Sequence, residues 1–447
     1  MKKKVSLPEI NNTVPVFKKN RNFFRNLFAF SGPGSLVAVG YMDPGNWITS
    51  IQGGALYEYL LISVIFVSSI IAMFLQVLCI KLGIVTGMDL AQATNFLVKN
   101  KKINLCLWII AELSIIATET AEIIGSTIAL SLLFKIPIIF GTIITILDVL
   151  LLLELTKFGI RKIEAIVFTL IFTVFLIFCY EVFLANPDMK KIFLSLLPNK
   201  KILYSYSNGN DSSFFISLGI IGATIMPHNL YLHSSIVQSR RYIRENEKDI
   251  KESIKYAIFD SNIQLSFSLI INCLLLILGA SLFFGKSPET VGKIFKIYYS
   301  LQNKNTIGEI ASSTLSNLFA IALLISGQSA SITGALSGQI VMEGFLNFRI
   351  SIWKRKMITR FFAIIPVLFC IFFYGNNNDK IEKLLIYTQI FLSIALPVSI
   401  IPLLYITSSK KIMKNFVNKK YQIFFGFLIA FILIILNIRL ILEIFFS

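Results

Sequence analysis

The chain has 447 residues, of which 55% are hydrophobic and 15% are charged, and its mean hydropathy is +0.75. Soluble domains carry about 25% charged residues, so this composition excludes an ordinary soluble protein and predicts a surface that largely faces lipid. The formal net charge is +18, but Lys and Arg lie in short loops between apolar runs. This pattern is typical of membrane topology signals rather than of a surface that binds nucleic acid, so we expect no nucleic-acid partner.

Apolar runs of the length that a membrane-spanning helix needs, about 20 residues, recur along the whole chain. In chain order they are residues 30–56, 60–82, 103–131, 137–157, 163–184, 213–238, 257–285, 313–345, 358–375, 383–406 and 421–445. The predicted fold class is therefore an all-α integral membrane protein with about eleven transmembrane helices.

The longest polar stretch, residues 185–212, separates five predicted spans from the next five. We therefore expect one block of five helices at 30–184 and a second block at 213–406. A tail at 1–29 precedes the first block, and residues 407–447 add a loop and one more helix.

Basic residues indicate the orientation, because cytoplasmic loops of membrane proteins are enriched in Lys and Arg. They gather in the N-terminal tail and then in alternate loops, at residues 99–102, 161–162, 240–244, 354–360 and 410–420. We expect a multi-pass protein of the cell inner membrane, with a cytoplasmic N-terminus, an external loop at 185–212 and an external C-terminus.

Two spans carry a proline and polar residues near their centres. The first contains Asp43-Pro44-Gly45-Asn46 and the sixth contains Met226-Pro227-His228-Asn229, so each is the first span of its block. Proline breaks a helix interior, and broken backbone is tolerated at membrane depth only where it is buried in protein or lines a cavity. Interrupted helices at corresponding positions of two halves predict a central binding site.

The residue types at these breaks suit a transition-metal ion. Asp43 and Asn46 offer hard oxygen donors, and Met226 offers a soft thioether that adds affinity for Mn²⁺, Fe²⁺ or Co²⁺ but not for Mg²⁺ or Ca²⁺. Unwinding also frees carbonyl groups, those of Gly40 and Ala223 among them, and Gln389 in the tenth span could add an amide oxygen. The alternatives are that Asp43 only caps a helix and that Met226 only packs.

Titratable residues in the membrane form a second set. Glu112, Glu119 and Glu122 fall on one face of the third span, which is typical of a proton relay. The alternative, ion pairs between helices with Arg240 or Arg360, is favoured for Glu112 and remains open for the other two.

The two histidines, His228 and His233, lie five residues apart in the sixth span and do not form an H-E-x-x-H motif, so we expect no metalloprotease and no enzyme. His228 is the better proton carrier, and His233 is equally consistent with a structural hydrogen bond. Each of the five cysteines sits in or beside an apolar run and is interpreted as a small hydrophobic residue. The sequence also leaves an organic-solute symporter of the same fold and a channel as rival interpretations.

Four motifs together resemble the Nramp family of proton-coupled metal transporters, especially its bacterial manganese-importing branch. They are GPGSLVAVGYMDPGNW at 32–47, ATETAEIIG at 117–125, GIIGATIMPHNLYLHS at 219–234 and GQIVMEGFLN at 338–347. The resemblance implies a LeuT-like fold with two inverted five-helix repeats and broken first and sixth helices. It also implies import of Mn²⁺ or Fe²⁺ with proton symport, by a protein that uses no cofactor, and we expect a monomer.

The resemblance also implies roles for individual residues. The implied metal ligands are Asp43, Asn46, Met226, Gln389 and the carbonyls of Gly40 and Ala223. The implied proton pathway comprises Asp43, Glu119, Glu122 and His228. This chain departs from the family where Glu119 replaces the usual Asp and where Glu58 stands in place of a common Gly.

Overall fold

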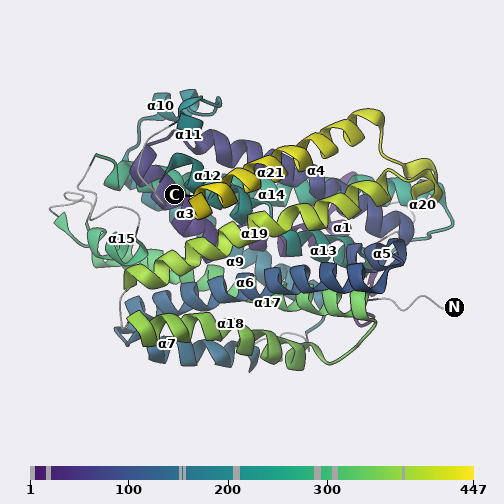
Figure 1. Cartoon of the computed structure of the whole chain (residues 1–447), viewed down its shortest axis with the longest axis horizontal. Helices are drawn as coiled ribbons and strands as arrows, with labels where there is room; N and C mark the ends of the chain where they lie inside the picture. The colour runs from purple at the N-terminus through teal and green to yellow at the C-terminus, as the bar shows by residue number, and fades with distance from the viewer. Residues whose placement is uncertain are drawn as a thin grey trace.

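The computed structural model describes residues 6–16, 22–150, 154, 158–204, 212–285, 293–304, 311–374 and 378–446. Within them the chain is almost entirely helical, and the helices lie side by side along the long axis of the molecule (Figure 1). The N-terminus, α5 and α20 lie at one end of this bundle, and α10, α11 and α15 lie at the other (Figure 1). We refer to these as the N-terminal end and the opposite end.

The first predicted span is a broken helix. α1 (Phe23–Phe30) precedes α2 (Pro33–Gly40), and α3 (Pro44–Tyr57) resumes after three residues that include Asp43. Pro44 stands in the first turn of α3, where a helix needs no backbone donor, so the proline starts the second half of the span instead of distorting it.

Unbroken helices complete the first block. They are α4 (Ile62–Thr86), the short α5 (Leu90–Leu97), α6 (Lys101–Phe134), α7 (Ile138–Ile144) with the 3₁₀ turn η1 (Thr145–Leu147), and α9 (Ile160–Ala185). Two short helices follow in the polar stretch, α10 (Met189–Leu194) and α11 (Lys201–Tyr204).

The second block repeats the pattern of a broken helix followed by long helices. α12 (Ser213–Thr224) and α13 (Pro227–Ile236) are separated by Ile225 and Met226, and η3 (Val237–Ser239) continues α13. The remaining elements are α14 (Glu247–Phe283), α15 (Ile294–Ser300), α17 (Ser313–Leu346), α18 (Ile352–Tyr374), α19 (Asn378–Thr407), α20 (Lys410–Met413), η6 (Lys414–Phe416) and α21 (Lys420–Phe446).

The all-α membrane architecture is confirmed. Among the described residues, 9 helices are long and apolar enough to cross a membrane, with α12 to η3 counted as one. The broken pair α2–α3 accounts for the first predicted span. The shorter apolar helix Ile138–Leu150 covers most of the fourth, whose residues 151–153 and 155–157 lie outside the described part. α14 begins at Glu247 rather than at residue 257, because polar turns capped by Asn246 extend it beyond its apolar run.

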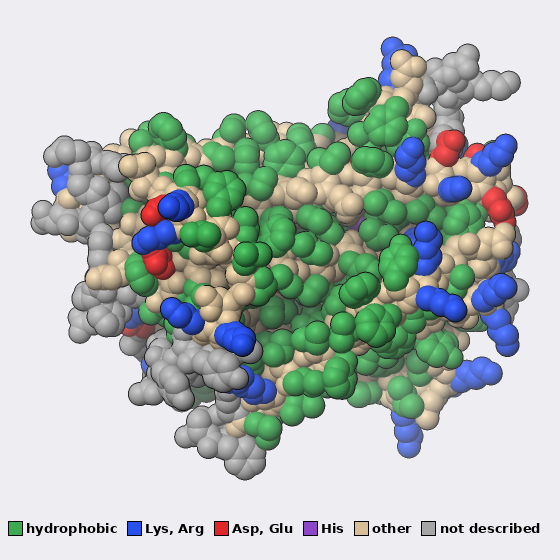
Figure 2. All heavy atoms as spheres, turned by 90° about the horizontal axis from the view of Figure 1, so that it is seen from above, with side chains coloured by type: hydrophobic (Ala, Val, Ile, Leu, Met, Phe, Trp, Pro, Cys, Tyr) green, Lys and Arg blue, Asp and Glu red, His purple; other side chains and the backbone are tan. Residues whose placement is uncertain are grey.

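The outer surface agrees with a lipid environment. Figure 2 shows hydrophobic side chains across the middle of one face, with Lys and Arg side chains towards both ends. Large aromatic side chains such as Phe183, Phe372 and Phe373 are among the most exposed hydrophobic groups. Such an apolar surface would be a liability in water and is stable in hydrocarbon.

The N-terminal segment, residues 6–16, is packed against the N-terminal end of the bundle. Its strand β1 (Val14–Pro15) pairs in parallel with β2 (Arg240–Arg241), directly after η3. The Leu7 amide donates to the Glu343 carboxylate of α17 at 3.0 Å, and the Leu7 side chain is buried. The segment therefore links the second broken helix to α17.

Candidate functional site

The break in the first span is organised by Asp43. Its carboxylate caps α3 by accepting the Asn46 backbone N–H at 2.9 Å, and it also accepts the Asn46 side-chain N–H at 3.2 Å. This arrangement follows from the sequence, because an Asp three residues before a free backbone amide is a favourable helix cap. The cap holds the carboxylate in the gap between α2 and α3.

The break in the second broken helix lies against the first. Asn46 reaches across with its side-chain nitrogen and donates to the backbone carbonyl of Ala223, in the last turn of α12, at 2.7 Å. That carbonyl is available because α12 ends at Thr224. Met226 is the extended residue immediately before Pro227 and is fully buried.

A third helix completes the site. Gln389 of α19 lies with its side-chain nitrogen 3.5 Å from the second Asp43 carboxylate oxygen, and its own amide oxygen is buried without a partner. Gly45 makes this approach possible, because a Cβ atom there would lie 1.8 Å from the Gln389 nitrogen. Gly222 allows α12 to approach the Gln389 backbone in the same way, since its Cβ would lie 2.2 Å from the Gln389 carbonyl oxygen.

Gly40 ends α2 beside a residue that the sequence analysis did not select. A Cβ at Gly40 would lie 2.3 Å from the side-chain nitrogen of Asn229, and neither polar atom of the Asn229 amide has a hydrogen-bond partner. Asn229 directly follows His228 in the second break. That position, mirroring Asn46 in the first break, was the signal that could have identified it.

The chemistry of the arrangement suits a cation. Buried polar atoms normally have partners, yet the Gln389 oxygen, the Asn229 amide and the Thr224 hydroxyl have none. To coordinate a cation, Asn46 would turn its amide oxygen towards the ion, since its nitrogen now occupies the space beside Asp43 and Ala223. All six residues predicted as ligands are buried, so an ion can reach them only after the helices move.

Among the described residues there is no group of three or more His, Cys, Asp or Glu side chains able to hold a metal. In the predicted ligand set Asp43 is the only such residue, and amide, carbonyl and thioether groups supply the rest. A site of this composition would bind more weakly than a structural zinc site, as passage of an ion requires.

The acidic residues of α6 lie in ion pairs with α18. Glu119 contacts Lys356 and lies 3.3 Å from Arg360, while Glu122 lies 3.6 Å from Lys356. Glu112 pairs with Arg355, as the ion-pair alternative predicted for it. The predicted partner Arg360 is therefore present, and the other predicted partner, Arg240, is not, because Arg240 pairs with Glu164. Lys356 was missed, since nothing in the sequence aligns α18 with α6.

The two histidines occupy separate environments. The His228 Nδ1 atom lies 3.2 Å from the Thr118 hydroxyl of α6, next to Glu119 in the chain, and its Nε2 atom is buried without a partner. His233 bonds Gln76 of α4 at 2.8 Å through Nδ1, which is the structural hydrogen bond that was one of its two predicted roles. His228 thus connects the second break to the helix that carries the acids.

Comparison with known protein families identifies the fold and the family. The family model described as natural resistance-associated macrophage protein-like, Nramp, matches residues 34–443. This chain belongs to the Nramp family. It is 54% identical over 440 residues to the divalent metal cation transporter MntH of Staphylococcus saprophyticus, covering 98% of this chain and 97% of the relative. It is 53% identical over 438 residues to MntH of Latilactobacillus sakei, covering 98% and 94%.

Solved structures agree with this membership. The manganese transporter of Eremococcus coleocola, in complex with an aromatic bis-isothiourea substituted compound, superposes with a TM-score of 0.90 at 43% identity, covering 97% of this Nramp chain and 90% of that chain. MhsT in complex with L-phenylalanine matches with a TM-score of 0.59 at 14% identity, covering 92% and 98%. That distant likeness concerns the fold alone and confirms the predicted LeuT-like architecture.

Both ends of this Nramp protein carry polar contacts that close the bundle. At the N-terminal end, Arg240 contacts the Glu164 carboxylate at 2.6 and 2.9 Å and also donates to the Ser31 carbonyl just before α2. At the opposite end, Glu58 ends α3 with a positive φ of 53°. Its carboxylate pairs with Lys191 of α10 at 2.8 Å, and this pairing raises the pKa of Lys191. Glu58 therefore has a strained backbone conformation, and its side chain links α3 to the polar stretch through Lys191.

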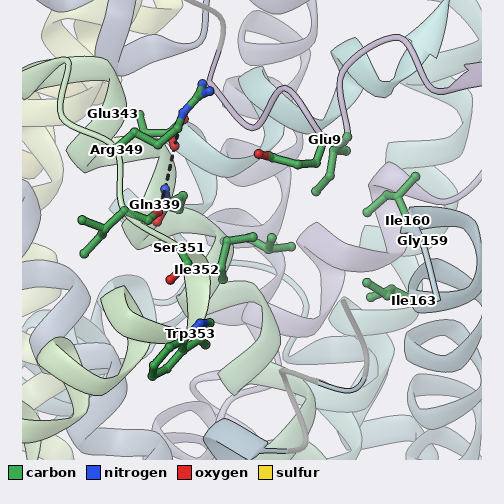
Figure 3. Close-up of a pocket in the computed structure, with 13 residues that line it drawn as sticks. Glu9, Gly159, Ile160, Ile163, Gln339, Glu343, Arg349, Ser351, Ile352 and Trp353 are labelled. Atoms are coloured by element: carbon green, nitrogen blue, oxygen red, sulfur yellow. Dashed lines mark hydrogen bonds and ion pairs between the residues drawn. The ribbon is translucent and has the colours of Figure 1, made fainter. Parts of the chain in front are cut away.

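A cavity of about 540 Å³ lies at the N-terminal end, apart from the residues around Asp43. Glu9 of the N-terminal segment, Ile160 and Ile163 of α9, and Trp353 of α18 line it (Figure 3). On its wall Glu343 accepts from Gln339 at 2.6 Å and from Arg349 at 3.1 Å, so the Glu343 carboxylate already has partners. This cavity carries no cluster resembling a metal site.

Proposed function

We propose that this protein is a secondary active transporter that imports divalent transition-metal ions, Mn²⁺ or Fe²⁺, across the inner membrane together with protons. The observation that carries the proposal is the meeting of Asp43, Asn46, the Ala223 carbonyl and Gln389 where two helices are broken. Family membership and relatives named as divalent metal cation transporters support the same conclusion.

The proposed ligands are Asp43, Asn46, Met226, Gln389 and the carbonyls of Gly40 and Ala223. Asp43 supplies the single negative charge, and the amide and carbonyl oxygens replace part of the hydration shell of the ion. The Met226 sulfur adds affinity for Mn²⁺ and Fe²⁺ that it cannot give to Mg²⁺ or Ca²⁺. The ion is the substrate, and we propose no resident cofactor.

The proposed proton pathway runs from Asp43 to Glu122, Glu119 and His228. Support comes from proximity, because α3 packs directly on α6: a Cβ at Gly125, three residues after Glu122, would lie 2.2 Å from Pro44, the residue after Asp43. The contact of His228 with Thr118 brings the imidazole to the same helix. A row of acids inside a membrane helix is typical of proton movement.

The proposed topology follows the distribution of basic residues. The N-terminal tail 1–29 and the loop that begins segment 407–447 are cytoplasmic, while the stretch 185–212 and the C-terminus are external. The blocks 30–184 and 213–406 are the two inverted repeats, which rock against each other to expose the site alternately to each side. We propose that a monomer is the transporting unit.

The test is Mn²⁺ uptake into proteoliposomes over a range of internal and external pH. We expect saturable uptake that increases with an inward proton gradient and disappears in Asp43→Ala. Asp249→Asn, which removes a half-buried carboxylate at the start of α14, outside the proposed site, is the matched control and should transport normally. Absence of uptake by a folded wild-type protein would reject the proposal.

A further inference from the structure

Seven buried ionisable groups form a charged cluster between α6, α18 and the turn after α7. They are the carboxylates Glu112, Glu119, Glu122 and Asp148 and the cations Arg355, Lys356 and Arg360. The side chain of Glu112 is 16% exposed and each of the others is 5% exposed or less. Unpaired charge is expensive in such surroundings, so the balance of charge within the cluster decides where protons reside.

The cluster contains one more carboxylate than it has cations. Glu112 and Arg355 pair with each other, which leaves Glu119, Glu122 and Asp148 to share Lys356 and Arg360. Lys356 contacts both Glu119 and Glu122. If Arg360 pairs with Asp148, Glu119 and Glu122 share only Lys356. These three side chains then carry a net charge of −1, which one added proton neutralises.

The contacts indicate that Arg360 pairs with Asp148 rather than with Glu119. One guanidinium nitrogen, Nη2, contacts the Asp148 carboxylate and also lies 3.2 Å from the Ser331 hydroxyl of α17. Ser331 in turn donates to the same Asp148 oxygen at 2.9 Å, which closes a three-residue ring. The other nitrogen, Nη1, lies 3.3 Å from Glu119, but neither atom of that contact has a hydrogen-bond partner.

We propose that Asp148 is a positioning residue for proton coupling, which holds Arg360 away from Glu119 so that the Glu119–Glu122 pair carries one exchangeable proton. This inference rests on the proposed proton pathway and adds a residue to it. Asp148 follows η1, on an element that supplies none of the six proposed metal ligands. Its effect on protons is therefore separable from metal binding.

The groups that face the pair come from each element packed around it. α6 contributes the two glutamates, α18 contributes Lys356 and Arg360, and α17 contributes the Ser331 carbonyl, which accepts from Lys356 at 3.1 Å. α13 brings His228 to Thr118, next to Glu119, and α3, which begins after Asp43, packs on α6 where Pro44 meets Gly125. α17 approaches closely because Gly334 has no side chain, and a Cβ there would lie 3.0 Å from Glu122 and 3.2 Å from Glu119. Within the described residues Lys356 is fixed by both glutamates and the Ser331 carbonyl, so Arg360 is the cation that can exchange one carboxylate partner for another.

The experiment measures Mn²⁺ uptake and proton influx in the same proteoliposomes, with one dye for each ion. In Asp148→Asn, Arg360 is free to neutralise Glu119, so the pair needs no proton. We expect Mn²⁺ uptake to continue while the protons carried per Mn²⁺ and the stimulation of uptake by external acid both fall at least about fivefold. Asp148→Glu keeps the charge and should restore both quantities.

The double variant Asp148→Asn with Arg360→Gln separates charge balance from structural support. It removes both partners, leaves Lys356 shared by the two glutamates and should recover proton coupling to within about twofold of wild type. Unchanged coupling in Asp148→Asn, or loss in both the single and double variants, would overturn the inference. The proposed function fails separately, if the wild-type protein itself moves no protons with Mn²⁺.

Discussion

Two buried polar regions of this protein balance charge in opposite ways. Around the two helix breaks, the single carboxylate of Asp43 is held by the backbone and side chain of Asn46 and by Gln389, and among the described residues no Lys, Arg or His forms an ion pair with it. In the charged cluster of α6 and α18, Glu119 and Glu122 share Lys356, while Arg360 lies against Asp148. One region therefore leaves its negative charge for an arriving cation, and the other pairs most of its carboxylates with cations of its own.

The difference shows how the proposed function could assign two kinds of ion to two separate regions of one membrane protein. Amide groups stabilise a carboxylate without cancelling its charge, so a divalent ion still gains from binding beside it. Cations next to carboxylates repel metal ions but let a proton move between acids as the pairs rearrange. In the proposed mechanism, separation of the two regions would allow each ion to act without displacing the other.

Loss of Lys356 should have the largest effect on this contrast. Lys356→Met leaves two buried glutamates without their shared cation, and removing one partner of a buried pair costs about 3–5 kcal/mol. We expect a clear drop in the thermal unfolding temperature of the purified protein in detergent. Lys356→Met combined with Glu119→Gln should recover most of this loss, and equal unfolding temperatures for the single variant and wild type would contradict the description of the cluster.

Loss of the Met226 sulfur should change the selectivity of the metal site and leave the charged cluster intact. We expect Met226→Ala to lower the preference for Mn²⁺ over Ca²⁺ by roughly 10- to 100-fold, as for loss of a tuned metal-site interaction. The measurement is Mn²⁺ uptake in competition with Ca²⁺. Ile225→Ala, a neighbouring buried apolar residue, is the control for packing, and the same selectivity in both variants would exclude a ligand role for the sulfur.

Asp89 is a buried carboxylate outside both regions, and it tests whether hydrogen bonds alone can hold such a group. Its expected effect is the smallest of the three. Asp89 caps α5 by accepting the Gln92 amide at 2.9 Å, and burial raises the pKa of Asp89 to about 6. A folded-state pKa above the unfolded value means that its contribution to stability is present at low pH and is lost as pH rises through about 6. Between pH 5 and 7 we expect a loss of about 1 kcal/mol.

The measurement for Asp89 is the thermal unfolding temperature of wild type and Asp89→Asn at pH 5, 6 and 7. Asparagine can still cap the helix but has no charge to bury, so this part of the pH dependence should vanish. If both proteins show the same pH dependence, hydrogen bonds alone are sufficient for a buried carboxylate. Asp43, which is held in a similar way, would then need no ion beside it either.

Much of the fold was predictable because its signals are local. Each apolar run predicts one membrane span, and each proline beside polar residues predicts one helix break. Helix ends were less predictable, as α14 shows, because polar turns can extend a helix into water without changing its apolar run. The pairing of Val14–Pro15 with β2 was not predicted, because two-residue strands carry no periodic pattern.

The sequence by itself determined which residues could serve as ligands and which acids lie inside the membrane. The chemistry of Asp43, Asn46 and Met226 is a property of the side chains, and their positions at two helix breaks follow from the prolines beside them. The ligand set stays a prediction until an ion is bound and measured.

Only the tertiary structure decided which partner each polar group has. It paired Glu119 with Lys356 rather than with Arg240, set Asn229 beside Gly40 and gave Arg360 to Asp148. Helical periodicity predicts the face on which a residue lies, but the depth of one helix relative to another depends on packing between segments that lie far apart in the sequence. Partners in a buried charged cluster therefore emerge only when the helices are assembled.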